Sequence, residues 1–207
     1  MKKVFAVPIE TRLLPLTPHS LCALEDADSY NWILFTSAHA VKYFAQYYFN
    51  KRRALPNKAQ IGAVGPSTAK ALTKLKLKVS LVPAKHTVEH LVRSLPNITG
   101  TRILFPRSAL APQDAIKTLR ARGARVRVVT LYTTHVPQIA LKQINALMQG
   151  KFSALSFRSP SAIHGLLTQC NQSQCAALFQ LRAYCIGPTT ARVAREAGFR
   201  KVTDIVV

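Results

Sequence analysis

Short apolar runs along the chain alternate with segments in which apolar residues recur at helical spacing. The runs are rich in β-branched and aromatic residues and predict strands at Trp32–Phe35, Gln60–Val64, Val79–Val82, Ile103–Phe105, Val126–Leu131, Ala154–Phe157, Arg182–Ile186 and near Val202, with a further strand signal in the first twelve residues. The segments between them predict helices at Ala38–Tyr48, Pro66–Leu75, Thr87–Ser94, Pro112–Arg122, Gln138–Gln149, Ser159–Thr168 and Pro188–Ala197. Such alternation is typical of parallel sheets with helices on both faces, so we predict an α/β fold.

Two strand-to-helix corners occur twice in the sequence. FTSAHAV is echoed by FRSPSAI, and VGPSTA is echoed by IGPTTA. One offset relates both pairs, because 159 − 37 and 187 − 65 both equal 122; it aligns Ser37 with Ser159 and Gly65 with Gly187. Two copies are too few for a solenoid. The sequence therefore predicts two similar α/β domains related by an internal repeat.

These corners carry Ser, Thr, Gly and Pro where strands end and helices begin. In α/β folds ligands bind beyond the carboxyl ends of the strands, and free N–H groups with hydroxyls at a helix start suit an anion. The alternative is that these residues only cap their helices; Thr36 or Ser37, for example, suits the cap of the helix that follows. Four corners in two matched pairs favour ligand binding.

Charge separates this chain from an average globular protein. Hydrophobic residues make up 48% of 207, which indicates a folded chain, and no apolar run approaches the length of a membrane span. Lys and Arg number 29 against 8 Asp and Glu, a net charge of +21. Such a balance points to a nucleic acid, an anionic surface or a carboxylate-rich substrate. The other reading is a basic protein whose lysines are only solvated.

The cysteines and the N-terminus bear on the compartment. The first residues, MKKVFAVPIETR, have too short an apolar stretch for a signal peptide, so we expect a cytoplasmic protein. No C-x-x-C pair occurs, and we expect free, reduced thiols at the four cysteines, Cys22, Cys170, Cys175 and Cys185.

The ordered set of motifs resembles the uroporphyrinogen-III synthase family over nearly the whole chain. The matching stretches are FTSAHAVKYF, AVGPSTAKAL, LRARGARVRVVTLYTTH, SFRSPSAIHGL and CIGPTTARVAREAGF. The resemblance implies two domains, residues 1–15 plus 134–207 and residues 16–133, joined by two extended strands, with a ligand cleft between them. It implies a monomer that binds hydroxymethylbilane, a linear tetrapyrrole with eight carboxylates. The enzyme inverts the last pyrrole ring and closes the macrocycle with loss of water, without metal or cofactor.

The resemblance also implies site residues. Tyr132 matches the family's cleft tyrosine, which would help the substrate hydroxyl depart; a strand tyrosine that packs at the hinge is the alternative. The other matched positions would bind substrate, namely Thr36, Ser37, Gly65, Ser67, Thr68, Ser159, Ser161, Gly187, Thr189 and Thr190. Arg158 stands where the family usually has Thr, and we expect it to contact a carboxylate or to face solvent.

The match begins at the family's second strand and stops before its last helix. We therefore expect the lobe of residues 1–15 and 134–207 to be incomplete, with about four strands and an open edge. Three functional hypotheses stay open. The first is a synthase, and the second is a family member that binds a polyanion, either a tetrapyrrole or a nucleic acid, without turnover. The third is a two-lobed α/β protein that binds a smaller anion.

Two other motifs suggest a function but can also be explained by structure alone. HTVEH at His86–His90 has the form of a zinc-protease motif, but a helix that starts at Thr87 would leave His86 outside it. YFAQYYF followed by KRR could stack single-stranded nucleic acid. Helical spacing instead predicts that Phe44, Tyr47 and Tyr48 face the core.

Overall fold

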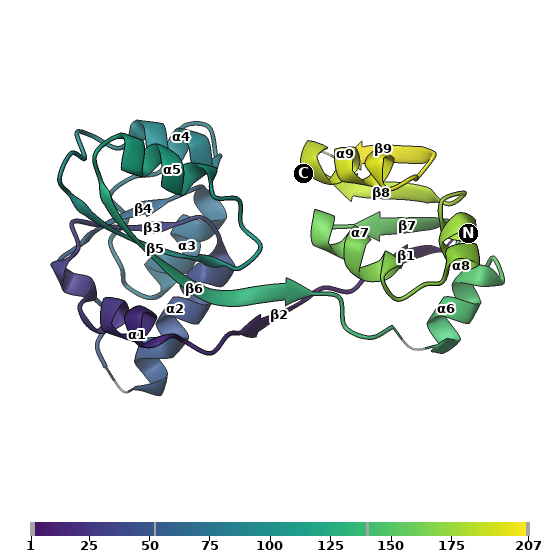
Figure 1. Cartoon of the computed structure of the whole chain (residues 1–207), viewed down its shortest axis with the longest axis horizontal. Helices are drawn as coiled ribbons and strands as arrows, with labels where there is room; N and C mark the ends of the chain where they lie inside the picture. Colours follow the sequence, from purple (N-terminus) through teal and green to yellow (C-terminus); the bar gives the residue numbers. More distant parts are fainter. Residues whose placement is uncertain (1–2, 52, 140, 206–207) are drawn as a thin grey trace. The chain divides into compact units, whose positions relative to one another are not determined.

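The computed structural model describes residues 3–51, 53–139 and 141–205 (Figure 1). The chain divides into two compact units, which we call the terminal lobe (Met1–Glu10 with Thr134–Val207) and the central lobe (Thr11–Thr133). The chain passes from one lobe to the other twice, within strands β2 and β6. These two strands are neighbours in one sheet.

The central lobe is built on a five-stranded sheet in the order β2-β6-β5-β3-β4 (Figure 1). The pairs β3–β4, β3–β5 and β5–β6 are parallel. The strands are β2 (Glu10–Leu13), β3 (Trp32–Phe35), β4 (Gln60–Ala63), β5 (Arg102–Ser108) and β6 (Arg125–His135). The helices are α1 (Pro18–Glu25), η1 (Ala27–Ser29, a 3-10 turn), α2 (Ala38–Asn50), α3 (Pro66–Lys74), α4 (Val88–Ser94) and α5 (Asp114–Ala121).

Both faces of this sheet carry a hydrophobic core. Ile33 and Phe35 of β3 point to a cluster that includes Phe44 of α2, whereas Trp32 and Leu34 point to a second cluster with residues of α4 and α5. Alternate strand residues face opposite sides, so one strand serves both clusters. The predicted core positions Phe44, Tyr47 and Tyr48 are all buried, which confirms the helical-face interpretation of this aromatic segment.

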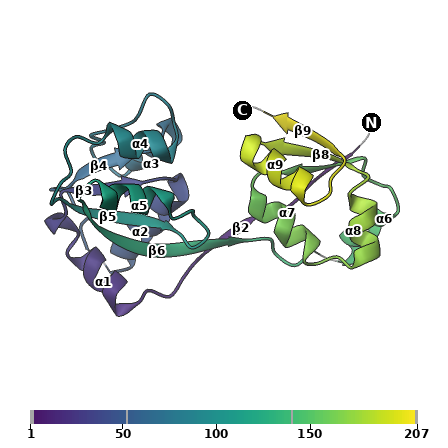
Figure 2. The ribbon, with the colours of Figure 1, turned by 45° about the horizontal axis from the view of Figure 1, so that its top comes forward.

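The terminal lobe has a four-stranded, all-parallel sheet in the order β1-β7-β8-β9 (Figure 1). The strands are β1 (Val4–Ala6), β7 (Ala154–Phe157), β8 (Arg182–Ile186) and β9 (Lys201–Ile205). The helices are α6 (Leu141–Met148), α7 (Pro160–Leu167), α8 (Gln172–Leu178) and α9 (Pro188–Glu196); α6 packs against α8, and α7 packs against α9 (Figure 2). The described core lies on the face of Leu155, Phe157 and Ala183. On the other face Ser156 and Tyr184 are only half-buried.

The internal repeat is present in the fold. The matched elements β3 and β7, α2 and α7, β4 and β8, and α3 and α9 begin at residues 32 and 154, 38 and 160, 60 and 182, and 66 and 188, each pair 122 positions apart. The strand register is also repeated, with Trp32 opposite Gln60 and Ala154 opposite Arg182. The prediction of two similar α/β domains is confirmed.

Some elements differ from the prediction. Val79–Val82 forms no strand and contributes one isolated bridge between Leu81 and Gly62. Strand β5 continues through Pro106 to Ser108, although Pro lacks an N–H. In the described residues, β3 pairs with β5 only at Ile103 and Leu104. Pro106 lies beyond these pairs, so its missing N–H costs no hydrogen bond to β3. Helices α1 and α8 were not predicted, although Thr17 with Pro18 and the Asn171 capping box mark their starts.

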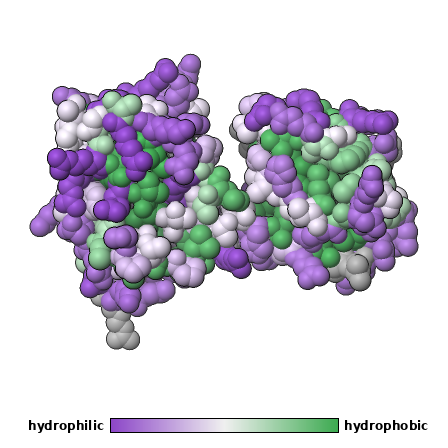
Figure 3. All heavy atoms as spheres, viewed as in Figure 1, coloured by the Kyte–Doolittle hydropathy of each residue, from purple (hydrophilic) through white to green (hydrophobic). Residues whose placement is uncertain are grey.

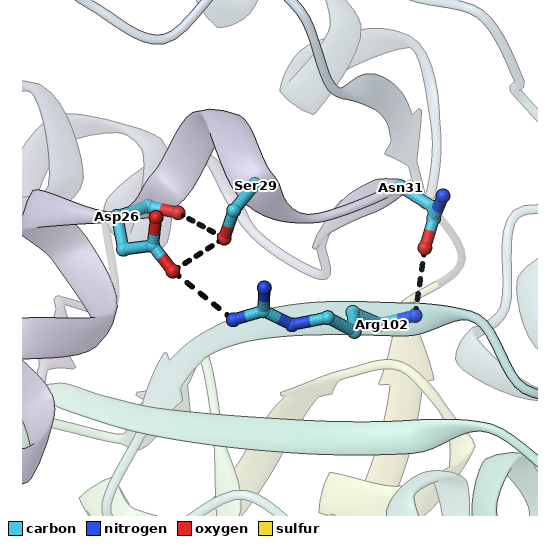
Figure 4. Close-up of polar contacts among 4 residues, drawn as sticks. All are labelled: Asp26, Ser29, Asn31 and Arg102. Carbon is cyan, nitrogen blue, oxygen red and sulfur yellow. Dashed lines mark hydrogen bonds and ion pairs between the residues drawn. The ribbon is translucent and has the colours of Figure 1, made fainter.

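A polar network fixes the amino ends of β3 and β5 (Figure 4). The side-chain carbonyl of Asn31 accepts from the Arg102 backbone N–H (2.8 Å), and the Asn31 N–H donates to the Arg102 carbonyl oxygen (2.9 Å). The Arg102 guanidinium pairs with Asp26 (3.1 Å) and lies over the Tyr30 ring. Hydrogen bonds from Ser29 and then Arg102 lower the pKa of Asp26. These contacts set the register that determines which residues meet at the carboxyl ends.

Hydrophilic side chains cover much of the face drawn in Figure 3, over both lobes. Across the part of the chain that the structure describes, no helix has the length and apolarity needed to cross a bilayer. The four cysteines are free, as predicted, and Cys185 is buried.

Candidate functional site

The hydroxyl of Ser37 makes two contacts at the carboxyl end of β3. It caps α2 by accepting from the Ala40 N–H (3.0 Å), as predicted for this corner. It also lies 2.8 Å from the phenolic oxygen of Tyr132. Ser37 has extended backbone (φ −163°), the usual conformation of a helix cap. The helix start and the β6 tyrosine therefore share one serine hydroxyl.

Tyr132 is held at its ring as well as at its hydroxyl. Its ring stacks on Tyr43 with centroids 5.1 Å apart and planes 22° apart, and the His39 ring lies 6.1 Å away. The Tyr43 hydroxyl donates to the carbonyl oxygen of Thr11 (2.6 Å), which anchors the stack to the β2 segment. Burial raises the pKa of Tyr132, and the hydrogen bond with Ser37 opposes this only in part. The phenol therefore keeps its proton at neutral pH and can donate it.

At the second corner of the central lobe, between β4 and α3, there is little space beside Gly65. Gly65 caps α3 with extended backbone (φ −173°), and a Cβ atom there would lie 3.0 Å from the Cβ of His86. This contact explains the glycine. Ser67 is exposed in the first turn of α3, whereas Thr68 is 1% exposed and Thr36, at the first corner, is half-buried.

The terminal lobe has the matching corners with different details. Ser159 caps α7 without a side-chain cap bond, and its hydroxyl instead lies 2.8 Å from that of Ser161. Arg158 is exposed. Gly187 caps α9 with φ +83°, a conformation that favours glycine. After it, Thr189 is exposed and Thr190 is 3% exposed.

Within each lobe the predicted residues gather at the carboxyl ends of the strands. Ser37 contacts Tyr132, and Ser159 contacts Ser161. Thr68 and Thr190 lie in the first turns of α3 and α9 and are buried, so little of either residue is accessible to a ligand. One charged residue at this edge, Arg107 at the end of β5, was not predicted. It is 3% exposed, and a short apolar strand carries no signal that a cation within it is buried.

The HTVEH segment adopts the conformation predicted for it. Thr87 caps α4, and His86 lies before the helix with its Nδ1 3.1 Å from the Pro83 carbonyl oxygen. His90 Nδ1 lies 2.7 Å from the Thr87 hydroxyl. Over residues 3–51, 53–139 and 141–205 no group of three or more His, Cys, Asp or Glu is placed to hold a metal ion.

The fold and these corners define a class: two-lobed α/β proteins in which a repeated pair of hydroxyl-bearing helix starts lies beyond the strand ends. The family model described as uroporphyrinogen-III synthase HemD matches residues 3–204. The chain belongs to the uroporphyrinogen-III synthase family, as the motifs indicated.

Named relatives agree with this assignment. The porphyrin biosynthesis protein HemD of Ruminiclostridium josui is 29% identical over 200 residues, which cover 94% of this chain and 39% of that protein. The chloroplastic uroporphyrinogen-III synthase of Oryza sativa subsp. japonica is 26% identical over 212 residues, which cover 94% of this chain and 67% of that protein. The chain therefore matches well under half of the first of these proteins and about two thirds of the second.

Solved structures share the fold. A mutant uroporphyrinogen III synthase from the extremely thermophilic bacterium Thermus thermophilus superposes with a TM-score of 0.67 at 22% identity, over 95% of this chain and 81% of that one. Uroporphyrinogen-III synthetase from Helicobacter pylori 26695 gives a TM-score of 0.66 at 18% identity, over 98% and 92%. At these identities the likeness concerns the fold.

Proposed function

We propose that this chain is a uroporphyrinogen-III synthase, a lyase of tetrapyrrole synthesis. It would close hydroxymethylbilane into uroporphyrinogen III with inversion of the last pyrrole ring and release of water. The observation that carries the proposal is the family match over residues 3–204. The ordered motifs at the four corners and the α/β fold of each lobe support it.

The composition suits an octa-anionic substrate. A net charge of +21 attracts a polycarboxylate over distance and raises the encounter rate. Within each lobe, exposed hydroxyls stand at helix starts, Ser67 in α3 and Thr189 in α9. Free N–H groups and the helix dipole there favour carboxylates. We propose that both lobes contribute such contacts, with exposed Arg158 as an added cation in the terminal lobe.

Tyr132 would act where water leaves. Its neutral hydroxyl, held by Ser37, would donate a hydrogen bond or a proton to the departing hydroxyl group of the substrate. The carbon–oxygen bond breaks, water departs, and the pyrrole ring stabilises the resulting cation. The last pyrrole ring is inverted as the macrocycle closes, and the pyrrole that forms the new carbon–carbon bond releases a proton, which restores the phenol. The protein's larger share is to hold the flexible chain with its two ends together.

The test is an assay that separates ring isomers. Purified protein is incubated with hydroxymethylbilane, the products are oxidised to porphyrins, and the type I and type III isomers are separated by chromatography. We expect type III in excess, since uncatalysed closure gives type I. Type I alone, at the rate without protein, would overturn the proposal; uroporphyrin binding in that case would favour the family member that binds without turnover. Cofactor independence, a cytoplasmic location and a monomeric state stay predictions.

A further inference from the structure

Arg107 is a buried cation that has no anionic partner among the residues that the structure describes. The residue is 3% exposed, and burial lowers the pKa of its guanidinium, which nevertheless stays protonated at neutral pH. It makes one hydrogen bond among the described residues, from Nε to the Ser108 carbonyl oxygen (3.1 Å). Its Nη1 is buried and has no hydrogen-bond partner there. A buried guanidinium with open donors is costly unless an acceptor completes it.

The chain does not supply that acceptor from its acidic side chains. It has only 8 Asp and Glu residues, and all of them lie in the described part of the structure. The ion pairs among these described residues join Glu or Asp to Arg53, Arg93, Arg102, His135 and Arg192. Arg107 is in none of them, so no described side-chain carboxylate of the chain pairs with it.

The position of Arg107 is one where α/β sheets bind ligands. In the order β2-β6-β5-β3-β4, the chain leaves β3 toward β4 on one side and leaves β5 toward β6 on the other. The crevice at the carboxyl ends of two such strands is the topological switch point. The pairs recorded between β3 and β5 are Trp32 with Ile103 and Ile33 with Leu104. Arg107 lies three residues beyond Leu104, near the carboxyl end of β5.

Strand alternation places the Arg107 side chain on one face of the sheet. Arg107 comes two residues after Phe105 within β5. Phe105 belongs to the core cluster that includes residues of α4 and α5, so Arg107 continues that face toward the carboxyl end of the strand. A buried guanidinium therefore follows the apolar core at the edge of the sheet where ligands bind.

We propose that Arg107 is a substrate-binding residue that receives one carboxylate of the linear tetrapyrrole at the β3–β5 switch point. The planar guanidinium matches a carboxylate with two parallel hydrogen bonds, and low exposure strengthens the pair. The inference rests on the proposed function for the identity of the substrate. The anion site itself follows from the burial and the missing acceptor.

The test measures binding and turnover separately in Arg107→Met and in a matched control, Arg125→Met. Arg125 is exposed at the amino end of β6, so the control removes the same charge from the opposite edge of the same sheet. The probe is uroporphyrin III, titrated by quenching of Trp32. We expect Arg107→Met to raise the probe Kd, and the KM for hydroxymethylbilane, by about tenfold or more, as for a lost charged hydrogen-bond pair. Arg125→Met should change both by roughly twofold or less at moderate salt.

The two proposals fail in distinguishable ways. Equal probe Kd values for Arg107→Met and Arg125→Met would overturn the Arg107 site while type III turnover by the parent still supports the synthase. A parent that binds uroporphyrin through Arg107 but does not turn over substrate would overturn the synthase and keep the site. If Arg107→Met does not fold, the Nε–H resonance of Arg107, assigned with Arg107→Lys, provides the measurement. It should shift when uroporphyrin III is added, and an unchanged resonance at saturation would overturn the site.

Discussion

The Ser37 hydroxyl lies 2.8 Å from the Tyr132 hydroxyl while it also caps α2 at Ala40. A serine hydroxyl has one proton and two acceptor positions, so it can serve both partners. The cap fixes the serine, and the serine fixes the tyrosine against the start of α2. A helix-capping contact thereby orients the phenol that we propose to act on the leaving group.

Replacing Tyr132 by Phe should reduce turnover more than binding. The ring and its stack on Tyr43 remain, and only the hydroxyl is lost. We expect kcat to fall by roughly ten- to a hundredfold, the low end for a positioned proton donor, because the substrate's own pyrroles assist the loss of water. The uroporphyrin III Kd should change little. Since burial raises the pKa of Tyr132, the parent's activity should show no loss from its ionisation below about pH 10.

The matched control for that experiment is Tyr48→Phe. Tyr48 is also buried in the central lobe, and its hydroxyl donates to the Leu24 carbonyl oxygen, away from the strand ends. This variant should lose about 1 kcal/mol of stability and keep its kcat. Turnover by Tyr132→Phe equal to that of the parent would remove the hydroxyl from the mechanism.

Ser37→Ala and Ser159→Ala should differ in stability although the two serines are repeat equivalents. The Ser37 side chain accepts the cap bond from Ala40, whereas Ser159 caps α7 without one. Loss of the Ser37 cap should destabilise the central lobe by about 1 kcal/mol, and Ser159→Ala should stay within roughly 0.5 kcal/mol for the terminal lobe. Urea unfolding followed by Trp32 fluorescence reports the first, and hydrogen exchange in α7 reports the second. Equal losses would contradict the capping difference.

The repeat is the part of the fold that the sequence predicted best. A single offset aligned β3, α2, β4 and α3 with β7, α7, β8 and α9. This worked because the equivalent corners of the two lobes need small and hydroxyl-bearing residues at the same positions. Contacts across the chain were beyond such patterns: Ser37 and Tyr132 are 95 positions apart, and no local signal pairs them. Arg107 was missed because the predicted strand ended at Phe105, before Pro106, whereas β5 continues to Ser108.

Gly187→Ala should destabilise the terminal lobe for a backbone reason. Its φ of +83° is a region that L side chains rarely adopt, while no heavy atom lies within 4 Å of an added Cβ. We expect a loss of about 1–3 kcal/mol from strain alone. Hydrogen exchange of the β8 and α9 amides, compared between the variant and the parent, measures this loss of stability.

Gly65→Ala provides the contrast at the equivalent position. Its backbone is extended, and the added Cβ would instead meet the Cβ of His86 at 3.0 Å. Removing the side chain with His86→Gly should therefore recover part of the stability lost in Gly65→Ala. A Gly187→Ala variant as stable as the parent would show that α9 can begin with a different backbone at this corner.

Uroporphyrin III binding should weaken as salt increases. The chain carries a net charge of +21, and the attraction of a polycarboxylate is partly long-range. Quenching of Trp32, the single tryptophan, which lies at the amino end of β3, reports binding to the central lobe. We expect Kd to rise on the order of tenfold between about 0.05 and 0.5 M salt. No binding at the lower salt would rule out this class of ligand.

The terminal lobe should be less stable than the central lobe. Its sheet has four strands, one of them the three-residue edge strand β1, and Ser156 and Tyr184 on one face are only half-buried. The central sheet instead packs a core on each face. Amide protection follows the local free energy of opening. Amides of Ala154–Phe157 and Arg182–Ile186 should therefore exchange well before those of β4.

Hydrogen exchange monitored by NMR on the purified chain resolves these amides. The control is the oligomeric state, because a β1 edge that pairs with a second copy would protect β7 without any change in the lobe itself. Equal protection of β4, β7 and β8 in a demonstrated monomer would contradict the prediction. It would mean that the short β1 pairing, Val4 to Ala154 through Ala6 to Ser156, closes the edge of the terminal sheet as firmly as a longer strand would. Faster exchange in β7 and β8 would locate the weaker half of the protein in the lobe that carries Ser159 and Gly187.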